Sequence, residues 1–174
     1  MKIIQTTIAI LVLATVTTLD LKGQILHTNG LVAYYPFNSN ANDVIGTNHG
    51  IVNGAVLTQN RFGLASAAYD FNGSNSQINF SSPPLTQVSN WTLSAWVKPA
   101  SLSQAGIAVQ VGFDNNNTGD GFGFGFFGNA TWSGIFSGLT GVSSGQVLTD
   151  VNQWHHMVMQ RDATVTKFFI NGIQ

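Results

Sequence analysis

The chain has 174 residues, enough for one domain with a sizeable core. Only 7% of the residues are charged, against about 25% in a typical soluble protein, and the formal net charge is −1. The chain has no basic patch, which argues against a nucleic-acid partner. The lack of cysteine excludes disulfides, thiolate metal sites and a cysteine nucleophile.

The N-terminus has the pattern of an export signal. Lys2 precedes the short apolar run Ile8–Ala14, and the small residue Gly23 follows a polar stretch. We therefore expect residues 1–23 to be a secretory signal peptide, leaving Gln24 first. The run is shorter than the about 20 residues that span a bilayer. The pattern predicts a secreted or cell-surface protein without membrane insertion after cleavage, and the alternative is a retained N-terminal anchor.

After Gln24, short apolar or alternating runs are separated by residues that favour turns. No segment shows a convincing helical period. The chain is therefore predicted to be all-β, with two packed antiparallel sheets. The predicted strands are Leu31–Phe37, Gly50–Leu57, Ala67–Phe71, Gln77–Phe80, Trp91–Lys98, Ile107–Phe113, Phe122–Phe127, Gly134–Phe136, Trp154–Arg161 and Lys167–Ile170.

Two of these runs alternate clearly. In Trp91–Lys98, every second residue from Trp91 to Val97 is apolar, and this set should enter the core, while Trp96 lies on the opposite face. In Trp154–Arg161 both sets mix polar and apolar residues, so the pattern does not decide which face is inward. We also expect hairpin turns at the two Asn-Gly pairs, Asn72-Gly73 and Asn171-Gly172.

Three groups of segments, in this order and spacing, resemble the bacterial laminin-G-like jelly-roll family, which is related to concanavalin A-like lectins and glucanases. The segments are Leu31–Asn38 with Asn40–Asp43 and Gly46–Gly50, then Tyr69–Gly73 with Ile78–Phe80 and Trp91–Pro99, and finally Trp154–Val158 with Arg161-Asp162 and Phe168–Gly172.

This resemblance implies a jelly-roll sandwich over residues 24–174. Family members continue past the Asn-Gly turn that here is Asn171-Gly172, so it also implies a domain that is incomplete at its C-terminus; the alternative is a complete small variant. The sequence departs from the family at Ile45, Asn72 and Ser76, where family members often carry serine or aspartate. These departures weaken any inherited metal site.

Catalysis within this domain is not expected. Related glucanases use two glutamates on one strand, and this chain has no glutamate. No two aspartates are spaced as Asp-x-Asp or Asp-x-x-Asp either. His155 and His156 are adjacent on a predicted strand and should point to opposite faces, so they cannot share one zinc ion.

One structural calcium ion is the only cofactor that the sequence suggests. Calcium takes six to eight oxygen ligands, and the stretch Asn40–Asp43 is rich in oxygen donors. The resemblance places similar stretches near a calcium ion in some family members. Asp43 is the best candidate ligand, with Asn48 and Asp70 as lesser ones. The alternative is a loop in which these side chains bind their own backbone.

Carbohydrate is the ligand class that the sequence favours. The polar loop after the predicted strand Ile107–Phe113 carries Asp114, Asn116 and Asp120, and Trp132 lies a little further along. These four residues are the candidate sugar-binding set, although Trp132 could equally be a packing residue. The other tryptophans, at positions 91, 96 and 154, are interpreted as packing residues.

Together these patterns predict a non-catalytic extracellular recognition or adhesion module. Its partner would be a glycan or another extracellular surface ligand, and it would form part of a larger secreted modular protein. The alternatives are a structural spacer without a ligand and an accessory domain of a polysaccharide-degrading enzyme. Fold alone does not decide among them.

Overall fold

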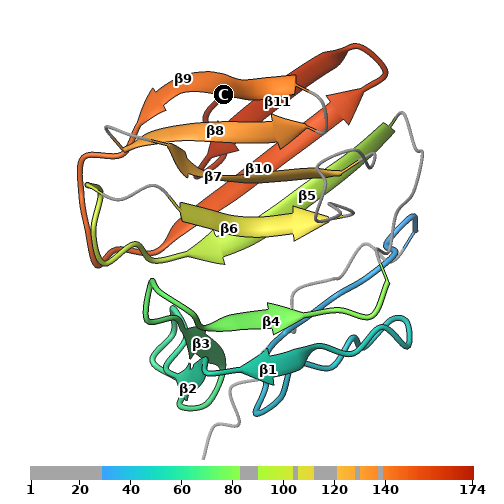
Figure 1. Cartoon of the computed structure of the whole chain (residues 1–174), viewed down its shortest axis with the longest axis vertical. Helices are drawn as coiled ribbons and strands as arrows, with labels where there is room; N and C mark the ends of the chain where they lie inside the picture. The colour runs from blue at the N-terminus through green and yellow to red at the C-terminus, as the bar shows by residue number, and fades with distance from the viewer. Residues whose placement is uncertain (1–28, 83–89, 104–105, 112–120, 128–129, 137–138) are drawn as a thin grey trace, which may run out of the picture. The chain divides into compact units, whose positions relative to one another are not determined.

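The computed structural model describes residues 29–82, 90–103, 106–111, 121–127, 130–136 and 139–174 (Figure 1). Within these ranges the chain forms strands and loops but no helix, and thus no helix long and apolar enough to cross a membrane. The strands are β1 (Ile51–Asn53), β2 (Val56–Thr58), β3 (Ala68–Asp70), β4 (Gln77–Asn79), β5 (Asn90–Val97), β6 (Gly106–Val111), β7 (Phe122–Phe127), β8 (Thr131–Phe136), β9 (Leu139–Val147), β10 (His155–Asp162) and β11 (Val165–Ile170).

All pairings between these strands are antiparallel, as predicted. Two larger sheets have the strand orders β11-β10-β5 and β6-β7-β8-β9. Two small sheets, β1-β4 and β2-β3, precede them in the sequence. Residues Leu31–Gln174 belong to one compact unit.

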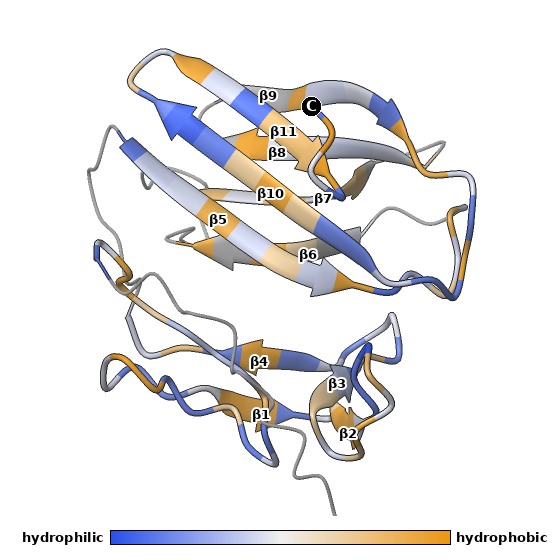
Figure 2. Ribbon diagram, turned by 180° about the vertical axis from the view of Figure 1, so that it is seen from behind, coloured by the Kyte–Doolittle hydropathy of each residue, from blue (hydrophilic) through white to orange (hydrophobic). Residues whose placement is uncertain are grey.

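The alternation predicted for β5 is confirmed. Trp91 is buried, and Leu93, Ala95 and Val97 pack against the same core, while the residues between them are exposed. Figure 2 shows this two-residue pattern of hydropathy along β5 and β10. The inward set is apolar at each position, which is why the pattern could be read from the sequence.

The structure also settles the orientation of β10. His155, Met157 and Met159 point inward and are buried, and His156 and Val158 lie on the opposite face. The register with β5 pairs Met157 with Ala95 and Met159 with Leu93, so the inward sets of both strands form one apolar face.

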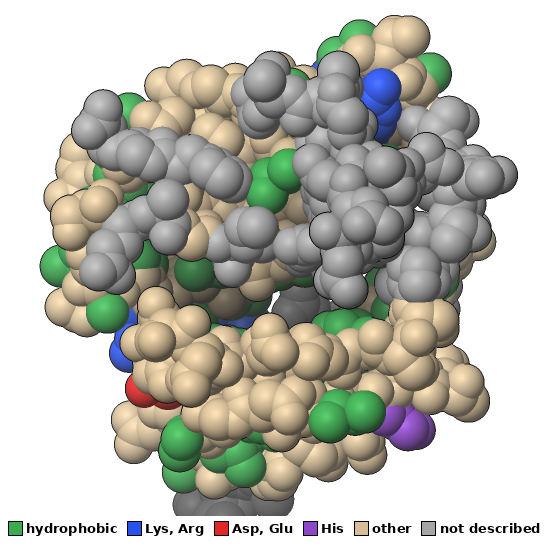
Figure 3. All heavy atoms as spheres, in the orientation of Figure 1, with side chains coloured by type: hydrophobic (Ala, Val, Ile, Leu, Met, Phe, Trp, Pro, Cys, Tyr) green, Lys and Arg blue, Asp and Glu red, His purple; other side chains and the backbone are tan. Residues whose placement is uncertain are grey.

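The core lies between the two larger sheets. The ring of Trp91 on β5 stacks on Phe122 of β7, with 3.9 Å between ring centroids. Trp132 of β8 contacts Phe168 of β11 edge to face at 6.2 Å. Burial of each such side chain contributes about 1.5–3 kcal/mol. The face shown in Figure 3 carries few charged side chains, in keeping with the low charge of the chain.

A glycine permits a close approach of the two larger sheets. A Cβ atom at Gly134 of β8 would lie 2.6 Å from the Cε atom of Met159 and 2.9 Å from the Cζ atom of Phe168. These side chains belong to the opposite sheet, and they rest directly on the backbone of β8.

The predicted strand Leu31–Phe37 is wrong, because this segment is irregular. The backbone N–H of Tyr34 donates to the Asp43 side chain at 3.0 Å instead of to a neighbouring strand. Phe37 also has a positive φ of 58° after Pro36. A side-chain acceptor and a left-handed residue therefore replace the regular strand.

Two other strand predictions need correction. The single run Gly50–Leu57 is two strands, β1 and β2, because Gly54 between them has a φ of 70°. The nine-residue strand β9 was not predicted. Its glycines and serines are typical of loops, but pairing with β8 overrides this local preference.

The two Asn-Gly pairs behave differently. Asn72-Gly73 does not form a two-residue hairpin, because β3 pairs with β2 and β4 pairs with β1. Asn171-Gly172 does form the predicted turn, with φ values of 52° and 82°. Ile173 then pairs with Ile170. Positive φ at both central residues is the mark of a type I′ turn, which matches the twist of paired strands.

Candidate functional site

The loop that was predicted to bind calcium is organised around Asp43. Its side chain is only 5% exposed, and Oδ1 accepts hydrogen bonds from the backbone N–H groups of Tyr34 and Ile45, both at 3.0 Å. The N–H of Gly46 is a third donor to this carboxylate. The N–H of Asp43 itself donates to Nδ1 of His49 at 3.2 Å. Asp43 thus joins two stretches of backbone into one loop.

The pKa of Asp43 reflects these contacts. Burial raises it, but the three backbone donors outweigh burial, with a further contribution from His49, so the pKa lies below its ordinary value. The phenol of Tyr35 lies nearby and donates to the backbone oxygen of Asn48 at 2.9 Å. Burial, followed by the charge of Asp43, raises the pKa of Tyr35. The carboxylate is therefore held ionised by backbone donors.

The other two predicted calcium ligands serve different purposes. The Asn48 side chain binds the segment at Ser81 and Ser82, accepting from the Ser81 hydroxyl at 3.1 Å and donating to the Ser82 carbonyl oxygen. Asp70 is exposed at the end of β3, in a different small sheet from β1 and β4.

These residues do not fit a calcium centre. The Oδ1 atoms of Asp43 and Asn48 already accept hydrogen bonds from the protein, whereas calcium takes six to eight oxygen ligands around one point. Across the parts of the chain that the structure describes, no three His, Cys, Asp or Glu side chains are grouped to hold a metal ion. The geometry favours the alternative of a hydrogen-bonded loop.

The predicted sugar-binding residues do not form a described site. Asp114, Asn116 and Asp120 lie outside the described residues. Trp132 is 0% exposed and packs among Phe124, Phe126 and Phe168, so its ring offers no face to a sugar. This placement corrects the prediction for Trp132, which is a core residue.

A different set of residues forms an exposed aromatic surface. Trp96 of β5 points away from the core and is 42% exposed. Its cross-strand neighbour on β10 is His156, and the two rings stack with centroids 4.9 Å apart at 23°. The Ser94 hydroxyl lies 2.8 Å from Nε2 of His156 and fixes the imidazole. Trp96, predicted to be a packing residue, therefore packs on the outside of the sheet.

The loop between β2 and β3 completes this surface. The Asn60 side-chain oxygen accepts from the N–H of Phe62 at 2.9 Å and of Leu64 at 3.1 Å, which fixes a tight turn. The turn presents Arg61, whose guanidinium carbon lies 4.4 Å from the Trp96 ring centroid and 4.2 Å from that of Phe62. Phe62 is 76% exposed. We call Arg61, Phe62, Trp96 and His156 the aromatic surface.

Electrostatics at the aromatic surface keep His156 neutral. Burial lowers the pKa of His156, and the positive charge of Arg61 lowers it further. At neutral pH the surface therefore offers two exposed aromatic rings, one guanidinium cation and an uncharged imidazole. Sequence reasoning missed Arg61, Phe62 and His156 because only folding brings the β2–β3 loop to β10. The one sequence feature that indicated this surface was Trp96, an aromatic residue on the otherwise polar face of its strand.

The two histidines lie on opposite faces of β10, as predicted. His155 points inward and is buried, with Nε2 3.4 Å from Oδ1 of Asp150 and Nδ1 3.4 Å from Nδ2 of Asn171. These contacts connect the start of β10 to the loop before it and to the last turn. They do not place a nucleophile beside His155.

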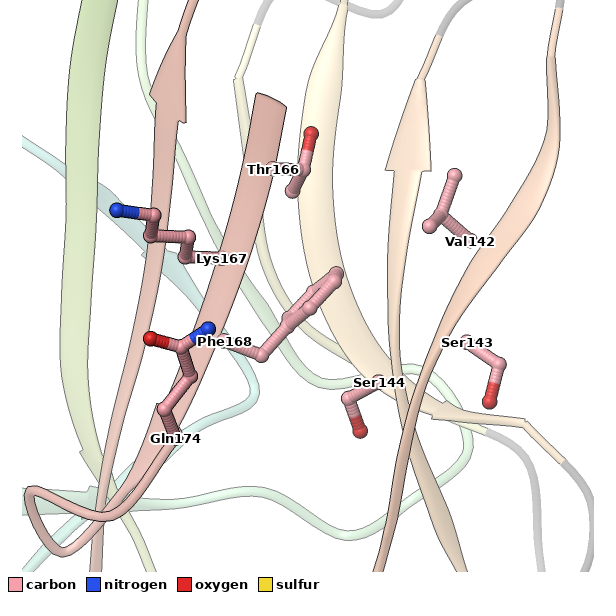
Figure 4. A pocket seen from close by; sticks show the side chains of 7 residues that line it. All are labelled: Val142, Ser143, Ser144, Thr166, Lys167, Phe168 and Gln174. Carbon is pink, nitrogen blue, oxygen red and sulfur yellow. The ribbon is translucent and has the colours of Figure 1, made fainter. Parts of the chain in front are cut away.

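A cavity of about 300 Å³ lies at the opposite end of the larger sheets from β5 and β6, between β9 and β11 (Figure 4). Its lining combines small hydroxyl groups with one aromatic ring. The residues that line it are Val142, Ser143, Ser144, Thr166, Lys167, Phe168 and Gln174. It is separate from the aromatic surface, which lies on β5, β10 and the β2–β3 loop.

Comparison with known proteins shows the family. A search of curated proteins and a search of solved structures each find no similar protein. The family model Laminin_G_3, described as concanavalin A-like lectin/glucanases superfamily, matches residues 72–174, which include both larger sheets. This match confirms the resemblance seen in the sequence. The chain therefore belongs to the concanavalin A-like lectin/glucanases superfamily.

Proposed function

We propose that this chain is a non-catalytic carbohydrate-recognition module that binds its glycan at the aromatic surface. The observation that carries the proposal is the pair of exposed rings, Trp96 and Phe62, that both contact the Arg61 guanidinium. The Phe62 ring, which is 76% exposed, offers an apolar surface to the C–H groups of a sugar, and Trp96 adds the part of its ring that His156 and Arg61 leave uncovered. Arg61 and Ser94 offer hydrogen bonds to the sugar oxygens. Membership in a superfamily of lectins and glucanases supports this ligand class.

A binding role fits the residues better than a catalytic one. Glycoside hydrolysis uses two carboxyl groups on either side of the scissile bond, and the aromatic surface contains none. The chain also has no glutamate. The module would serve adhesion or recognition directly, or hold a catalytic domain of the same protein near its polysaccharide.

In this proposal the two larger sheets are the two layers of a jelly-roll sandwich in an exported protein. Residues 1–23 are removed as a signal peptide, and the module functions outside the cell. The basis is the charged and apolar pattern from Lys2 to Gly23. N-terminal sequencing of the secreted protein tests it: the mature chain should begin at Gln24, and a chain that still begins at Met1 contradicts it.

A glycan array followed by titration with the retained glycan tests the binding function. We expect Trp96→Ala to weaken binding at least tenfold, which corresponds to about 1.4 kcal/mol. Phe62→Ala should weaken it about threefold. Phe71→Ala is the matched control, since Phe71 is also an exposed phenylalanine but lies beyond β3, and it should bind like the unmodified chain.

Two results would contradict the proposal. If no glycan is retained at millimolar concentration, the chain is a structural spacer. If a glycan binds the Trp96→Ala protein with unchanged affinity, binding takes place elsewhere on the chain. Circular dichroism of each variant shows that a loss of binding does not come from unfolding.

A further inference from the structure

The guanidinium of Arg61 has aromatic partners but no anionic partner within the described ranges. Arg61 is only partly exposed, and its guanidinium carbon lies within 4.4 Å of the ring centroids of both Phe62 and Trp96. No aspartate of the described ranges is within ion-pair distance of it. Rings that contact the flat face of a guanidinium leave its N–H groups, which lie in the plane, available to donate. Arg61 thus offers a positive charge and hydrogen-bond donors beside two rings.

A second cation lies over a second ring on the same side of the sheet. Lys98 directly follows β5, and Trp154 directly precedes β10. The residues next to them, Val97 and His155, pair with each other and face the core. Alternation therefore directs Lys98 and Trp154 outward, as it does Trp96. The Nζ atom of Lys98 is 5.5 Å from the centroid of the Trp154 ring, and no ion pair of Lys98 is found in the part of the chain that the structure describes.

The two cations lie close enough for one ligand to contact both. Trp96 and Lys98 are successive outward residues, and such residues are about 7 Å apart along a strand. Arg61 contacts the ring of Trp96 itself. A short oligosaccharide that lies along this end of β5 therefore meets both positive charges.

No described acidic side chain neutralises this end of the sheet. The outward face of β5 and β10, shown in Figure 2, carries one acidic residue among those described, Asp162, and its partner Asn90 is at the opposite end of β5 from Trp96. After burial, the charge of Arg61 is the second cause of the low pKa of His156. The field at this end of the sheet is therefore positive, which favours an anionic ligand.

We propose that the glycan bound at the aromatic surface is acidic, a chain of uronic acid residues whose carboxylates pair with Arg61 and Lys98. The inference rests on the proposed glycan-binding function and specifies its ligand class. A carboxylate matches the planar fork of a guanidinium through two parallel hydrogen bonds. The sugar rings of the same chain place their C–H groups on Phe62 and on the uncovered part of Trp96. A neutral sugar would leave both positive charges unpaired.

Tetragalacturonate and its fully methyl-esterified form are the matched probes, because esterification removes the charges and keeps the sugar chain. Isothermal titration calorimetry with the full chain at pH 7 should show that the acid binds about tenfold more tightly than the ester, as expected for charge-assisted hydrogen bonds. Raising the NaCl concentration from about 20 mM to about 300 mM should weaken binding of the acid about threefold, because salt screens exposed charges. Binding of the ester should hardly change.

Substitutions that remove one charge each locate the site. Arg61→Gln should weaken binding of the acid about tenfold and leave binding of the ester within about twofold, whereas Arg61→Lys, which keeps the charge but not the fork, should retain part of the affinity. Lys98→Gln should weaken binding of the acid about threefold. Lys167→Gln is the matched control, because Lys167 is exposed on β11 opposite Gln160, away from both rings, and its loss should leave the affinity unchanged.

The possible results separate this inference from the proposed function. If the acid binds no more tightly than the ester, while a neutral glycan binds and Trp96→Ala weakens that binding, the surface binds glycans and the preference for acidic ones is wrong. If Arg61→Gln and Lys167→Gln weaken binding of the acid equally, the preference comes from overall charge and the assigned site is wrong. If neither probe nor any glycan of the array is retained, the proposed function itself fails, and this inference fails with it.

Discussion

The segment Leu31–Phe80 and the strands from Asn90 onward are held together by different interactions. The later strands share one apolar cluster with fully buried members such as Trp132, Met157 and Met159. The earlier segment has strands of only three residues, and single polar side chains that bind several backbone groups fix its loops. A chain with few charges thus combines a hydrophobic core with hydrogen bonds from polar side chains to the backbone.

The largest effect should come from the core. Trp132→Ala should lower the free energy of unfolding by about 3–5 kcal/mol, because it removes a fully buried ring and leaves a cavity. Trp96→Ala, at an exposed tryptophan, should cost less than about 1 kcal/mol. Urea denaturation followed by fluorescence and circular dichroism measures both. Equal costs would contradict the assignment of Trp132 to the core and Trp96 to the surface.

The next largest effect should come from Asp43. Asp43→Ala removes the acceptor of three backbone donors and should cost about 2–3 kcal/mol at neutral pH. The pKa of Asp43 is lower in the folded chain than in the unfolded one. Its stabilisation is therefore present above the unfolded pKa of about 4 and is lost as the pH falls through the folded pKa. Unfolding curves between pH 7 and pH 2 should show this loss in the unmodified chain only.

The effect of calcium on thermal stability distinguishes a calcium site at Asp43 from a loop that hydrogen bonds alone hold together. Because hydrogen bonds already occupy Asp43 and Asn48, the melting midpoint should be the same in calcium and in chelator. A ligand that binds only the native state raises the midpoint. A clear rise with calcium that Asp43→Ala abolishes would restore the calcium interpretation.

Asn72 should have a smaller effect. Its Oδ1 accepts from the N–H groups of Ser74, Asn75 and Ser76 and from the Ser76 hydroxyl, at 3.0–3.1 Å. Asn72→Ala should cost about 1–2 kcal/mol, because these groups are exposed and water replaces part of what is lost. Asn72→Asp keeps the acceptor and should stay near the unmodified chain in thermal and urea unfolding. Similar losses for both variants would show that the acceptor oxygen is not what matters.

The smallest effect on stability should come from Arg61. Arg61→Met removes the like charge beside His156, so the pKa of His156 should rise toward about 6.5 while burial still holds it lower. Because the pKa of His156 is lower in the folded chain than in the unfolded one, the free energy of unfolding decreases as the pH falls below the unfolded pKa. The decrease should be smaller in Arg61→Met than in the unmodified chain. NMR titration of the imidazole measures the shift, and an unchanged value would place Arg61 away from His156 in solution. The free energy of unfolding at pH 7 should change by less than about 0.5 kcal/mol.

The sequence predicted the parts of the fold that depend on local pattern. The apolar alternation from Trp91 to Val97 and the Asn171-Gly172 turn are both determined by residues within a few positions of one another. It failed where tertiary pairing decides, as in the Gly- and Ser-rich β9. The prediction also failed where a side chain distant in the sequence accepts a hydrogen bond from the backbone, as Asp43 does from the N–H of Tyr34.

The candidate site was harder to predict than the fold. Trp132 was grouped with the polar loop before β7 as a candidate sugar-binding residue, but its position on β8 directs it into the core. The alternation in its strand placed Trp96 on the face away from the core, but it was assigned to packing, and its partners His156 and Arg61 come from other segments. The contact between Arg61 and Trp96 joins residues 35 positions apart, and no local pattern indicates it.

The loop around Asn72 has a chemical consequence over time. An asparagine before a glycine slowly loses its amide, and the product is either aspartate or isoaspartate. Aspartate would leave an oxygen at the centre of the loop for the same four donors. Isoaspartate would add a methylene group to the main chain and move that oxygen out of reach. Ageing at this one position would therefore yield two populations, one that keeps the loop and one that loses it.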